Sequence, residues 1–497
     1  MHTALLLDMA ADAAADRLAI GPLKGGLTFG ELRARAHAGA SRLAAIGGGT
    51  VVYVGVNGMA LPLAIFASGL IGKPFAPLNY RLPDADLRKL LARTAPSVAI
   101  VDDDMLARCE GVEGVTLISR SAFEAACAEP AAEGFSPLEE GHDIAVLLFT
   151  SGTTGEPKAA ILRHANVTAY VTSTVEFLGA GENEAALVSV PPYHIAGISA
   201  VLTGVYSCRR VVHLEAFTAE GWVDLAAREA ITHAMVVPTM LGRILDVVEA
   251  RGESLPAMQA ISYGGGRMPL PVIERAMNIL PHVDFANAYG LTETSSTISI
   301  LGPDDHRMAL YSDDPAAHRR LGSVGRPLPS VEVEIRNEQG GVCPPGVSGE
   351  IYVRGDQVAG EYTHKRVLND EGWFATNDGG WMDEEGYLYV EGRLDDVIVR
   401  GGENISPGEI EDVLRGHPGV EGVAVLGAPD DQWGETVAAF VVPKAEAPAE
   451  AELAEWVRSR LRSTKTPEIW RFVEALPYND TGKLLRRQLK LELKQPA

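Results

Sequence analysis

Short β-rich runs alternate with helical patterns along much of the chain. The runs typical of buried strands are VVYVGV, SVAIVD, AALVSVPP, THAMVVPTM and AISYGG. Strands separated by helices of this length form βαβ units, which build mostly parallel sheets with helices on their faces. The pattern predicts an α/β fold with a large N-terminal domain made of parallel-sheet subdomains. At 497 residues the chain is also too long for one ordinary core, which agrees with several subdomains.

The secondary-structure pattern of the sequence changes near residue 331. Short strands punctuated by turns follow, and they predict a small antiparallel or barrel-like β subdomain over about 331–393. Beyond Arg393, two strand-like runs surround the helical stretch SPGEIEDVLRGH. We therefore expect a large domain over 1–393 and a small α+β domain over 394–497.

The charge of the chain limits its partners. Its 43 lysines and arginines face 66 aspartates and glutamates, which gives a formal net charge of −23 at pH 7. A field of that sign repels polyanions, so we expect neither a nucleic acid nor an anionic membrane surface as a partner. A phosphate-bearing ligand must be held locally, by backbone N–H groups and a few cations.

The cysteines indicate a reducing, cytoplasmic location. They are scattered and fit no metal-binding spacing, so we predict that all are reduced and buried. The four cysteines are Cys109, Cys127, Cys208 and Cys343.

No membrane span is expected. The uncharged run from Val51 to Gly72 is long enough to cross a bilayer, but Asn57, Gly58 and Pro62 divide it into a strand and a buried helix. The first residues of the chain carry acidic side chains where a signal peptide needs basic ones, and they predict an amphipathic helix instead.

One stretch is unusually rich in glycine and hydroxyl groups. It runs from Thr150 to Lys158 as TSGTTGEPK, between the apolar run AVLLFT and the run ILRHANVTAYV, which predicts the start of a helix. Glycines let such a loop turn its backbone N–H groups toward one point, where an oxyanion can bind. It is not the common GxxxxGK[ST] phosphate loop, because alanine follows Lys158. A bland linker has a similar composition, but the hydroxyl groups and the lysine favour a polyphosphate ligand.

Five motifs together resemble those of a known superfamily. They are TSGTTGEPK (150–158), PPYHIAG (191–197), NAYGLTE (287–293), GRLDDVIVRGGENISPGEIE (392–411) and NDTGKLLRR (479–487). Their content and order resemble the acyl-adenylate-forming superfamily of acyl-CoA synthetases, carrier-protein adenylation domains and luciferases, over essentially the whole chain. Within this superfamily, the overall sequence pattern of the chain is most similar to that of the acyl-CoA ligases. The resemblance implies a mobile small domain that turns about a hinge at Asp395.

The resemblance implies a site for Mg·ATP. The residues it assigns to the nucleotide and its phosphates are Thr150, Ser151, Gly152, Thr153, Thr154, Gly155, Lys158, Gly264, Gly265, Asn287, Tyr289, Gly290, Asp378 and Arg393. Thr292 would contact the α-phosphate, and Glu293 would bind Mg²⁺, which proteins hold with one or two carboxylates plus substrate phosphates. Asn377 stands where the family's ribose motif has glycine, a mild departure because asparagine also tolerates positive φ.

Lys483 is the strongest catalytic candidate. A lysine near a basic C-terminus is usually a solvated charge, but YNDTGK matches the family position of the lysine that meets the carboxylate and the α-phosphate. Two anions react only where cations balance their charge, and Lys483 and Mg²⁺ would supply them. Thr292, Glu293 and His194 are the other catalytic candidates by resemblance. His194 would position the acyl group rather than act as a base, because the attacking carboxylate is already ionised near neutral pH.

Coenzyme A is the expected thiol substrate. The resemblance places Gly401, Gly402 and Trp433 along the path of its pantetheine arm, although turn glycines and a half-buried tryptophan are the plainer interpretations. The segment TKTPE weakens the case for coenzyme A, because it has Lys465 but no further positive charge.

The acid is less clearly specified. The residues expected to shape its pocket are Tyr193, His194, Ile195, Val237, Pro238, Thr239, Gly266, Arg267 and Ser295. Relatives that activate amino acids place an aspartate just after the histidine motif, and YHIAGISAVLTG has none, which argues against an α-amino acid. The largely neutral pocket favours a monocarboxylic fatty, alicyclic or aromatic acid, while Arg267 leaves a dicarboxylic acid open.

The expected activity is that of an ATP-dependent carboxylic acid:CoA ligase. It would form an acyl-adenylate with release of pyrophosphate, and then an acyl-CoA thioester with release of AMP. Two alternatives stay open: a ligase that loads the acyl group onto a carrier protein, and a catalytically silent nucleotide-binding protein with an interaction role. The intact motifs argue against the second. The sequence also leaves open whether the chain forms a homodimer.

Overall fold

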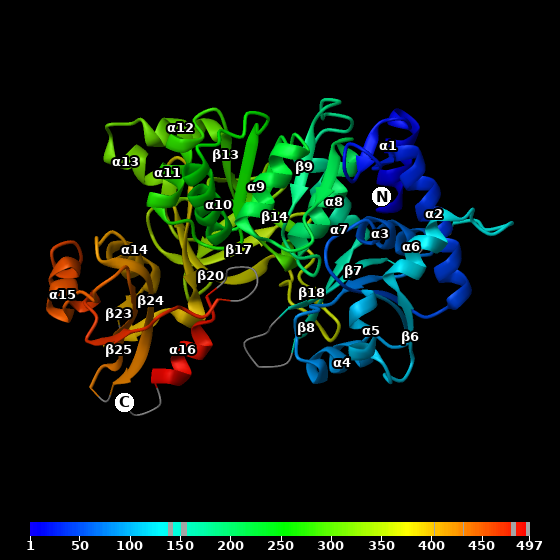
Figure 1. Cartoon of the computed structure of the whole chain (residues 1–497). Coiled ribbons are helices and arrows are strands. Elements are labelled where there is room, and N and C mark those ends of the chain that lie inside the picture. The colour runs from blue at the N-terminus through cyan, green and yellow to red at the C-terminus, as the bar shows by residue number, and fades with distance from the viewer. Residues whose placement is uncertain (138–142, 151–156, 402, 431, 479–483, 494–497) are drawn as a thin grey trace.

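The computed structural model describes residues 1–497 except 138–142, 151–156, 402, 431, 479–483 and 494–497. The described residues form a large N-terminal domain and a small C-terminal one, which lies at lower left in Figure 1. The large domain contains two broad sheets with helices on their faces, together with a smaller antiparallel sheet. This is the α/β architecture that the sequence predicts.

The first broad sheet has eight strands in the described part of the chain. In order across the sheet they are β19 (Lys365–Arg366), β18 (Glu361–Tyr362), β8 (Lys158–Arg163), β7 (Ile144–Thr150), β4 (Phe75–Pro77), β3 (Thr50–Val54), β5 (Ser97–Val101) and β6 (Val115–Ser119). From β7 to β6 neighbouring strands run parallel, as βαβ units require. β8 runs antiparallel to β7, so a hairpin flanks residues 151–156.

This hairpin corrects one sequence prediction. The run that begins at Ile161 was expected to start a helix, but β8 continues to Arg163 and helix α7 begins at His164. A short apolar run does not distinguish strand from helix by periodicity alone. Here the pairing of β8 with β7 on one side and β18 on the other decides in favour of a strand.

The second broad sheet has nine strands among the described residues. In order they are β15 (Arg326–Pro327), β14 (Ser296–Leu301), β13 (Asp284–Leu291), β12 (Ala260–Gly264), β11 (His233–Val236), β9 (Ala185–Val188), β10 (Arg210–His213), β1 (Leu18–Ile20) and β2 (Leu27–Thr28). The strands from β13 to β1 run parallel, and β14, β15 and β2 are antiparallel additions at the two edges.

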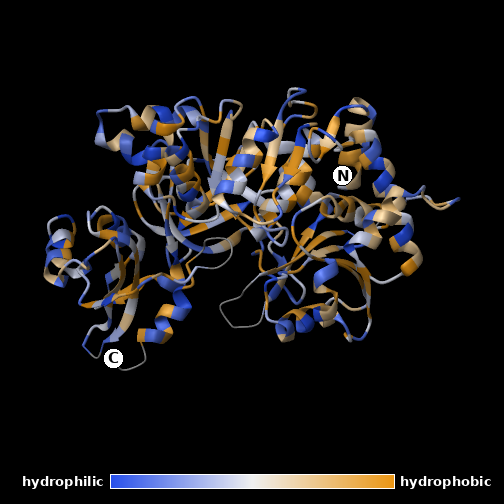
Figure 2. Cartoon of the chain, viewed as in Figure 1, coloured by the Kyte–Doolittle hydropathy of each residue, from blue (hydrophilic) through white to orange (hydrophobic). Residues whose placement is uncertain are grey.

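Helices join the two sheets into one body. They are α1 (Ala4–Ala14), α2 (Phe29–Ile46), α3 (Ala60–Leu70), α4 (Asp84–Arg93), α5 (Leu106–Cys109), α6 (Arg120–Ala128), α7 (His164–Thr174), α8 (Ile195–Tyr206), α9 (Ala219–Arg228), α10 (Pro238–Arg251), α11 (Leu270–Ile279), α12 (Pro303–Leu310) and α13 (Pro315–His318), with the 3-10 turns η1 (Asp103–Met105), η2 (Thr292–Thr294) and η3 (Arg319–Gly322). One hydrophobic cluster combines α1, α2, α3, α7 and α8 with strands of both sheets, for example Phe75 of β4 and Val211 of β10. The sheets therefore share a core, and Figure 2 shows hydrophobic residues concentrated on these inner elements.

The β-rich stretch after residue 331 forms a four-stranded antiparallel sheet in the described chain. Its strands in order are β16 (Glu332–Arg336), β17 (Gly349–Arg354), β20 (Phe374–Met382) and β21 (Leu388–Arg393). Between β17 and β20, the short strand β18 pairs with β8 of the eight-stranded sheet, and β19 pairs with β18 at the edge of that sheet. This crossing brings residues of the C-terminal third of the large domain to the hairpin that flanks residues 151–156.

The small domain follows the turn η4 (Leu394–Asp396). Its described elements are β22 (Ile398–Arg400), β23 (Glu403–Ile405), α14 (Pro407–Arg415), β24 (Val420–Asp430), β25 (Gly434–Pro443), α15 (Glu450–Arg458), η5 (Ser463–Lys465), β26 (Ile469–Phe472) and α16 (Arg486–Leu493). A five-stranded sheet with its own hydrophobic core holds the domain together. The expected α+β unit is therefore present.

The run from Val51 to Gly72 divides as predicted, into buried strand β3 and buried helix α3. No described helix combines the length and the apolar character needed to cross a bilayer. The thiols of Cys109, Cys127 and Cys208 are free and buried, as expected, but Cys343 is only partly buried because it lies in a turn between β16 and β17.

Candidate active site

The motif NAYGLTE lies at the carboxyl end of β13. Only glycine fits at position 290, because a Cβ atom there would lie 1.8 Å from the Ser296 carbonyl oxygen. The turn η2 follows and carries Thr292 and Glu293. Ser295 then adopts a left-handed conformation (φ 56°), and the chain reverses into β14. Ligands of open α/β sheets bind outside the carboxyl ends of the strands, so the motif stands where a nucleotide site is expected.

Three predicted nucleotide residues converge beside this motif. The Tyr289 hydroxyl donates to Asp378 Oδ2 at 2.6 Å, and Arg393 Nε lies 3.1 Å from Asp378 Oδ1. Burial raises the pKa of Tyr289, and the adjacent Asp378 carboxylate raises it further, so the phenol stays protonated and remains a donor. Arg393 also donates to the Thr376 carbonyl oxygen at 2.8 Å. The Asp378 carboxylate, which the resemblance assigns to the nucleotide, is therefore held from two sides, by Tyr289 and by Arg393.

Asn377 connects this carboxylate to the hinge region. Its backbone is left-handed, with φ 59°, the conformation for which the family motif has glycine. Unlike glycine, asparagine has a side chain, and its Nδ2 donates to Asp395 Oδ2 at 2.9 Å. Asp395 lies in η4, between the large and the small domain. The departure from the motif thus adds a contact to the predicted hinge residue.

The predicted metal ligand Glu293 is held by a residue that sequence reasoning missed. The Tyr362 hydroxyl donates to Glu293 Oε1, and the backbone N–H groups of Ala359 and Gly360 lie 2.8 Å and 3.3 Å from the Glu293 carbonyl oxygen. Burial and the Glu293 carboxylate both raise the pKa of Tyr362, so this phenol also stays protonated. Nothing in the motifs signals Tyr362, because its partner lies 69 positions away in the sequence.

The single carboxylate of Glu293 suits Mg²⁺ better than it suits a metal ion that is coordinated by protein side chains alone. Among the described residues no group of three or more His, Cys, Asp or Glu side chains could hold a metal ion. Magnesium is commonly bound through one or two carboxylates, substrate phosphates and water, so a single oriented carboxylate is the donor that Mg·ATP needs.

The two ends of the hydroxyl-rich loop are close together. Thr150 and Lys158 are paired residues at the tip of the β7–β8 hairpin, and the Thr150 hydroxyl lies 3.4 Å from the Lys158 carbonyl oxygen. Turn η2, with Thr292 and Glu293, packs against β8. The turn that carries the predicted metal ligand therefore lies against the strand that begins at Lys158. The remaining loop residues named as candidates lie outside the described residues: Ser151, Gly152, Thr153, Thr154 and Gly155.

Other predicted nucleotide residues shape the neighbouring strand ends. Gly264 ends β12, and a Cβ atom there would lie 2.2 Å from the Ala288 carbonyl oxygen of β13. Gly265 follows with φ 76°. Asn287 is buried, and its side-chain amide donates to the Ser323 carbonyl oxygen at 2.9 Å, which gives it a structural role in this arrangement.

The histidine motif forms the loop between β9 and α8. His194 is the residue before the first turn of α8. Its ring lies 4.7 Å from that of Tyr193, which is buried and in turn meets the ring of Tyr80 edge to face at 5.7 Å. The loop is thus anchored by aromatic packing, as a positioning role for His194 requires.

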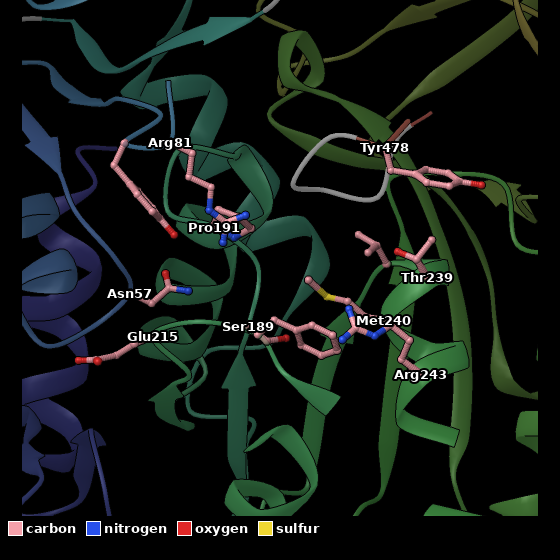
Figure 3. Close-up of a pocket in the computed structure, with 12 residues that line it drawn as sticks. Asn57, Arg81, Ser189, Pro191, Glu215, Thr239, Met240, Arg243 and Tyr478 are labelled. Atoms are coloured by element: carbon pink, nitrogen blue, oxygen red, sulfur yellow. The ribbon is translucent and has the colours of Figure 1, made fainter. Parts of the chain in front are cut away.

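A cavity of about 390 Å³ lies beside this loop. Pro191, Val237 and Thr239 line it from the large domain, and Tyr478 from the small domain. Figure 3 shows Tyr478 approaching Thr239 from above. Several residues predicted for the acyl pocket are not among the described lining residues: Tyr193, His194, Ile195, Pro238, Gly266, Arg267 and Ser295. The cavity therefore overlaps the predicted acyl site at Val237 and Thr239 but does not include the rest of it.

Two buried polar atoms of the cavity wall lack hydrogen-bond partners among the described residues. Asn57 Nδ2 donates to the carbonyl oxygens of Val190 and Leu214, at 2.9 Å and 3.2 Å, which leaves its Oδ1 without a donor. Ser189 Oγ is likewise unpartnered, and both side chains line the cavity (Figure 3). A buried polar atom without a partner costs about 1–3 kcal/mol, so these atoms are suited to a ligand with hydrogen-bonding groups.

Sequence reasoning missed these two residues, although a signal was present. Asn57 follows β3 and Ser189 follows β9, and both therefore lie just beyond the carboxyl end of a parallel strand. Two guanidinium groups also line the cavity: Arg81, and Arg243, which lies 5.5 Å over the Phe217 ring.

Arg267, which was expected in the acyl pocket, instead joins the two domains. Its guanidinium forms an ion pair with Asp412 of α14 in the small domain. Gly408 permits the approach, since a Cβ atom there would lie 2.4 Å from Arg267 Nη1. Burial raises the pKa of Asp412, while the positive charges of Arg267 and Arg415 oppose that shift. The Ser406 hydroxyl adds a second bond across the boundary, to the Glu391 carbonyl oxygen at 3.1 Å.

The predicted thiol-path residues lie on the small domain, away from the cavity. Gly401 donates its N–H to the Trp433 carbonyl oxygen at 2.8 Å, and the Trp433 side chain is 46% exposed. Neither residue lines the cavity as described. Gly402 and Lys483 lie outside the described residues. In this arrangement the chain just before residue 479 faces the large-domain site, and Gly401 does not.

Comparison with known proteins agrees with these features. Residues 7–363 match the AMP-binding enzyme family, and residues 409–483 match the AMP-binding enzyme C-terminal domain. The chain is 33% identical over 493 residues to a 2-succinylbenzoate–CoA ligase from Bacillus licheniformis, covering 97% of this chain and 98% of that relative. It is 33% identical over 477 residues to a feruloyl-CoA synthase from an Amycolatopsis species, covering 93% of each chain.

Solved structures show the same likeness. The O-succinylbenzoate coenzyme A synthetase from Bacillus subtilis, in complex with ATP and a magnesium ion, superposes with a TM-score of 0.84 at 31% identity. The match covers 98% of this chain and 99% of that one.

Proposed function

The chain belongs to the AMP-binding enzyme family, and from that premise we propose that it is an ATP-dependent ligase joining an aromatic or alicyclic carboxylic acid to coenzyme A. Its cofactors are ATP, Mg²⁺ and coenzyme A. The observation that carries the proposal is the convergence of Tyr289, Asp378 and Arg393 with Glu293 at the carboxyl end of β13. Tyr289, Asp378 and Arg393 suit a ribose, and Glu293 suits Mg·triphosphate.

The first half-reaction follows from this arrangement. Asp378, already oriented by Tyr289 and Arg393, accepts hydrogen bonds from the ribose hydroxyls. We assign the β- and γ-phosphates to the hairpin ends Thr150 and Lys158, which are paired across β7 and β8. Bound Mg²⁺, held by Glu293, would offset the negative charge of the triphosphate. An oxygen of the acid carboxylate bonds to the α-phosphorus, the bond to the bridging oxygen breaks, and pyrophosphate leaves.

We propose that Lys483 and Thr292 stabilise the negative charge that shifts at the α-phosphate during this step. Both reactants are anions, and a cation fixed at the α-phosphate lowers the barrier more than one recruited from solvent. Tyr478, five positions before Lys483, lines the cavity in the arrangement described here. That placement supports a small domain turned for adenylate formation.

The cavity supports coenzyme A as the acceptor. Its thiol must reach the acyl-adenylate by a path separate from the nucleotide, and the cavity lies beside the histidine loop on the side where Tyr478 enters. Asn57 Oδ1 and Ser189 Oγ can bond to amide groups of a pantetheine arm. Arg81 and Arg243 line the cavity together with Glu215, so a phosphate there would meet two positive charges and one negative charge in a chain whose net charge is −23. The positive charge that TKTPE lacks is thus available on the large domain.

The second half-reaction requires a different placement of the small domain. Gly401 and Trp433 are not among the residues that line the cavity as described, so we propose that the domain turns about Asp395 after the adenylate forms. The turn withdraws the segment that contains Lys483 and brings Gly401 to the thiol path. The thiol sulfur then bonds to the acyl carbon, the bond from that carbon to the phosphate oxygen breaks, the thiol proton passes to solvent, and AMP leaves.

The test is pyrophosphate release from Mg·ATP with aromatic, alicyclic, fatty and dicarboxylic acids, each with and without coenzyme A. Sustained turnover of one acid class that requires coenzyme A is the expected result. Release that stops after about one equivalent per active site, with or without coenzyme A, would point instead to a carrier-protein acceptor. No release with any acid would refute the ligase activity.

A further inference from the structure

The carboxylate of Glu293 is fixed by a strand that belongs to another part of the chain. Tyr362, whose hydroxyl donates to Glu293 Oε1, is one of the two residues of β18. β18 lies within the stretch that otherwise forms the four-stranded sheet, but it pairs with β8, where Tyr362 stands opposite Ala160. The position of the tyrosine hydroxyl is therefore set by β8, the strand at the end of the hydroxyl-rich loop.

A directional ion pair holds β18 against β8. Arg163, the last residue of β8, donates to both carboxylate oxygens of Glu361, from Nε and from Nη2, each at 2.9 Å. A two-pronged pair of this kind fixes orientation as well as distance. Since Glu361 directly precedes Tyr362, the pair restrains the backbone from which the tyrosine projects. The backbone bonds from Ala359 and Gly360 to the Glu293 carbonyl oxygen restrain the same segment from the other side.

We propose that Tyr362 is a positioning residue for the magnesium-binding carboxylate, an inference that rests on the proposed function. By bonding to Oε1, the hydroxyl restrains rotation of the carboxylate, and Oε2 would be the oxygen that binds the cation. Magnesium demands near-octahedral geometry, so a freely rotating carboxylate binds it less well than a fixed one. Hydrogen bonds that orient metal-ligating groups are typically worth about 10- to 100-fold in metal affinity.

The substitution Tyr362→Phe isolates the hydroxyl, because the ring and its packing remain. A matched control is available outside the candidate site, where the Tyr387 hydroxyl donates to Asp305 Oδ1 at 2.6 Å. Tyr387→Phe removes the same type of bond and leaves the nucleotide residues untouched. If the two variants differ in the Mg²⁺ dependence of ATP binding, the cause is the loss of the bond to Glu293 in particular, and not the loss of a tyrosine hydrogen bond in general.

The experiment is a calorimetric titration of each protein with ATP, in EDTA and over a series of Mg²⁺ concentrations. All three proteins are expected to bind metal-free ATP equally. The Mg²⁺ concentration that gives half of the gain in ATP affinity should rise about 10-fold in Tyr362→Phe and stay unchanged in Tyr387→Phe. The Mg²⁺ midpoint of ATP–pyrophosphate exchange should shift by the same factor, with the KM values for acid and coenzyme A unchanged.

Two results would overturn the inference. One is a Mg²⁺ midpoint in Tyr362→Phe equal to that of the wild type. The other is a shift that persists in a Glu293→Gln background, where a hydroxyl acting through Glu293 has nothing left to orient. Should Tyr362→Phe not fold, Arg163→Lys loosens β18 instead and should produce a smaller shift in the same direction, and no shift there counts against the inference. Failure of the proposed function is distinguishable, because the wild type itself would then release no pyrophosphate.

Discussion

The substitution Asp412→Asn is expected to shift the balance between the two half-reactions. In the arrangement described here, Asp412 of the small domain pairs with Arg267 of the large domain. Its other ion pair is with Arg415, 3.2 Å away on the same helix, and that contact persists wherever the small domain moves. Of the two ion pairs of Asp412, only the one with Arg267 therefore depends on how the small domain is placed.

The magnitude follows from the exposure of the pair. The side chains of Arg267 and Asp412 are 40% and 33% exposed, which places the pair between a surface and a buried one. Exposed pairs contribute about 0.2–1 kcal/mol, and breaking a buried pair costs about 3–5 kcal/mol. An intermediate value of about 1–2 kcal/mol corresponds to a factor of about 5–30 in the ratio of the two arrangements.

The assay measures each half-reaction separately. ATP–pyrophosphate exchange reports adenylate formation, and a single turnover of preformed acyl-adenylate with coenzyme A reports thioester formation. Asp412→Asn should lower the ratio of the first rate to the second by up to the factor given above. The control is Asp224→Asn, because Asp224 pairs with Arg251 at 2.6 Å entirely within the large domain. An unchanged ratio in Asp412→Asn, or an equal change in the control, would refute the reasoning.

Three further substitutions test other parts of the site. Lys483→Ala should abolish pyrophosphate release while calorimetry still shows nearly normal ATP binding, and unchanged release would contradict the mechanism. Arg243→Glu should raise the KM for coenzyme A about 10-fold, since one charge-assisted phosphate contact contributes about 1.5 kcal/mol, with pyrophosphate exchange unaffected. A KM within twofold of the wild type would remove Arg243 from the thiol path. Asn377→Gly restores the family residue but loses the 2.9 Å bond to Asp395, about 1 kcal/mol, so the half-reaction ratio should fall about fivefold. The same ratio in both proteins would show that this bond does not couple the ribose segment to the hinge.

The sequence predicted best where a motif lies on one continuous element. NAYGLTE occupies the end of β13 and the turn after it, so the placement of Tyr289, Gly290 and Glu293 follows from a short stretch of chain. Asp378 and Arg393 were found in the same way, and they pair because β20 and β21 are neighbouring antiparallel strands, in which these two residues face each other.

The residues that sequence reasoning missed or misplaced depend on long-range topology. Tyr362 reaches Glu293 only because β18 leaves its own sheet to pair with β8, and a two-residue strand has no periodicity to signal this. Arg267 follows Gly266, which was expected to border the acid, but its partner is decided by the orientation of the small domain. Asn57 also depends on long-range contacts. Its buried amide is held at the cavity by hydrogen bonds to carbonyl oxygens just after β9 and β10, which lie far along the chain.

The exposed indole of Trp433 gives this chain an internal optical signal. Of the six tryptophans, Trp222, Trp373 and Trp470 are buried and Trp381 and Trp456 are partly buried, whereas Trp433 is the most exposed, at 46%, and lies beside Gly401. Turning Gly401 toward the site would move that indole from water into an interface, shifting its emission to shorter wavelength and shielding it from iodide quenching. Stopped-flow fluorescence could then time the reorientation within a single catalytic cycle, with no label attached.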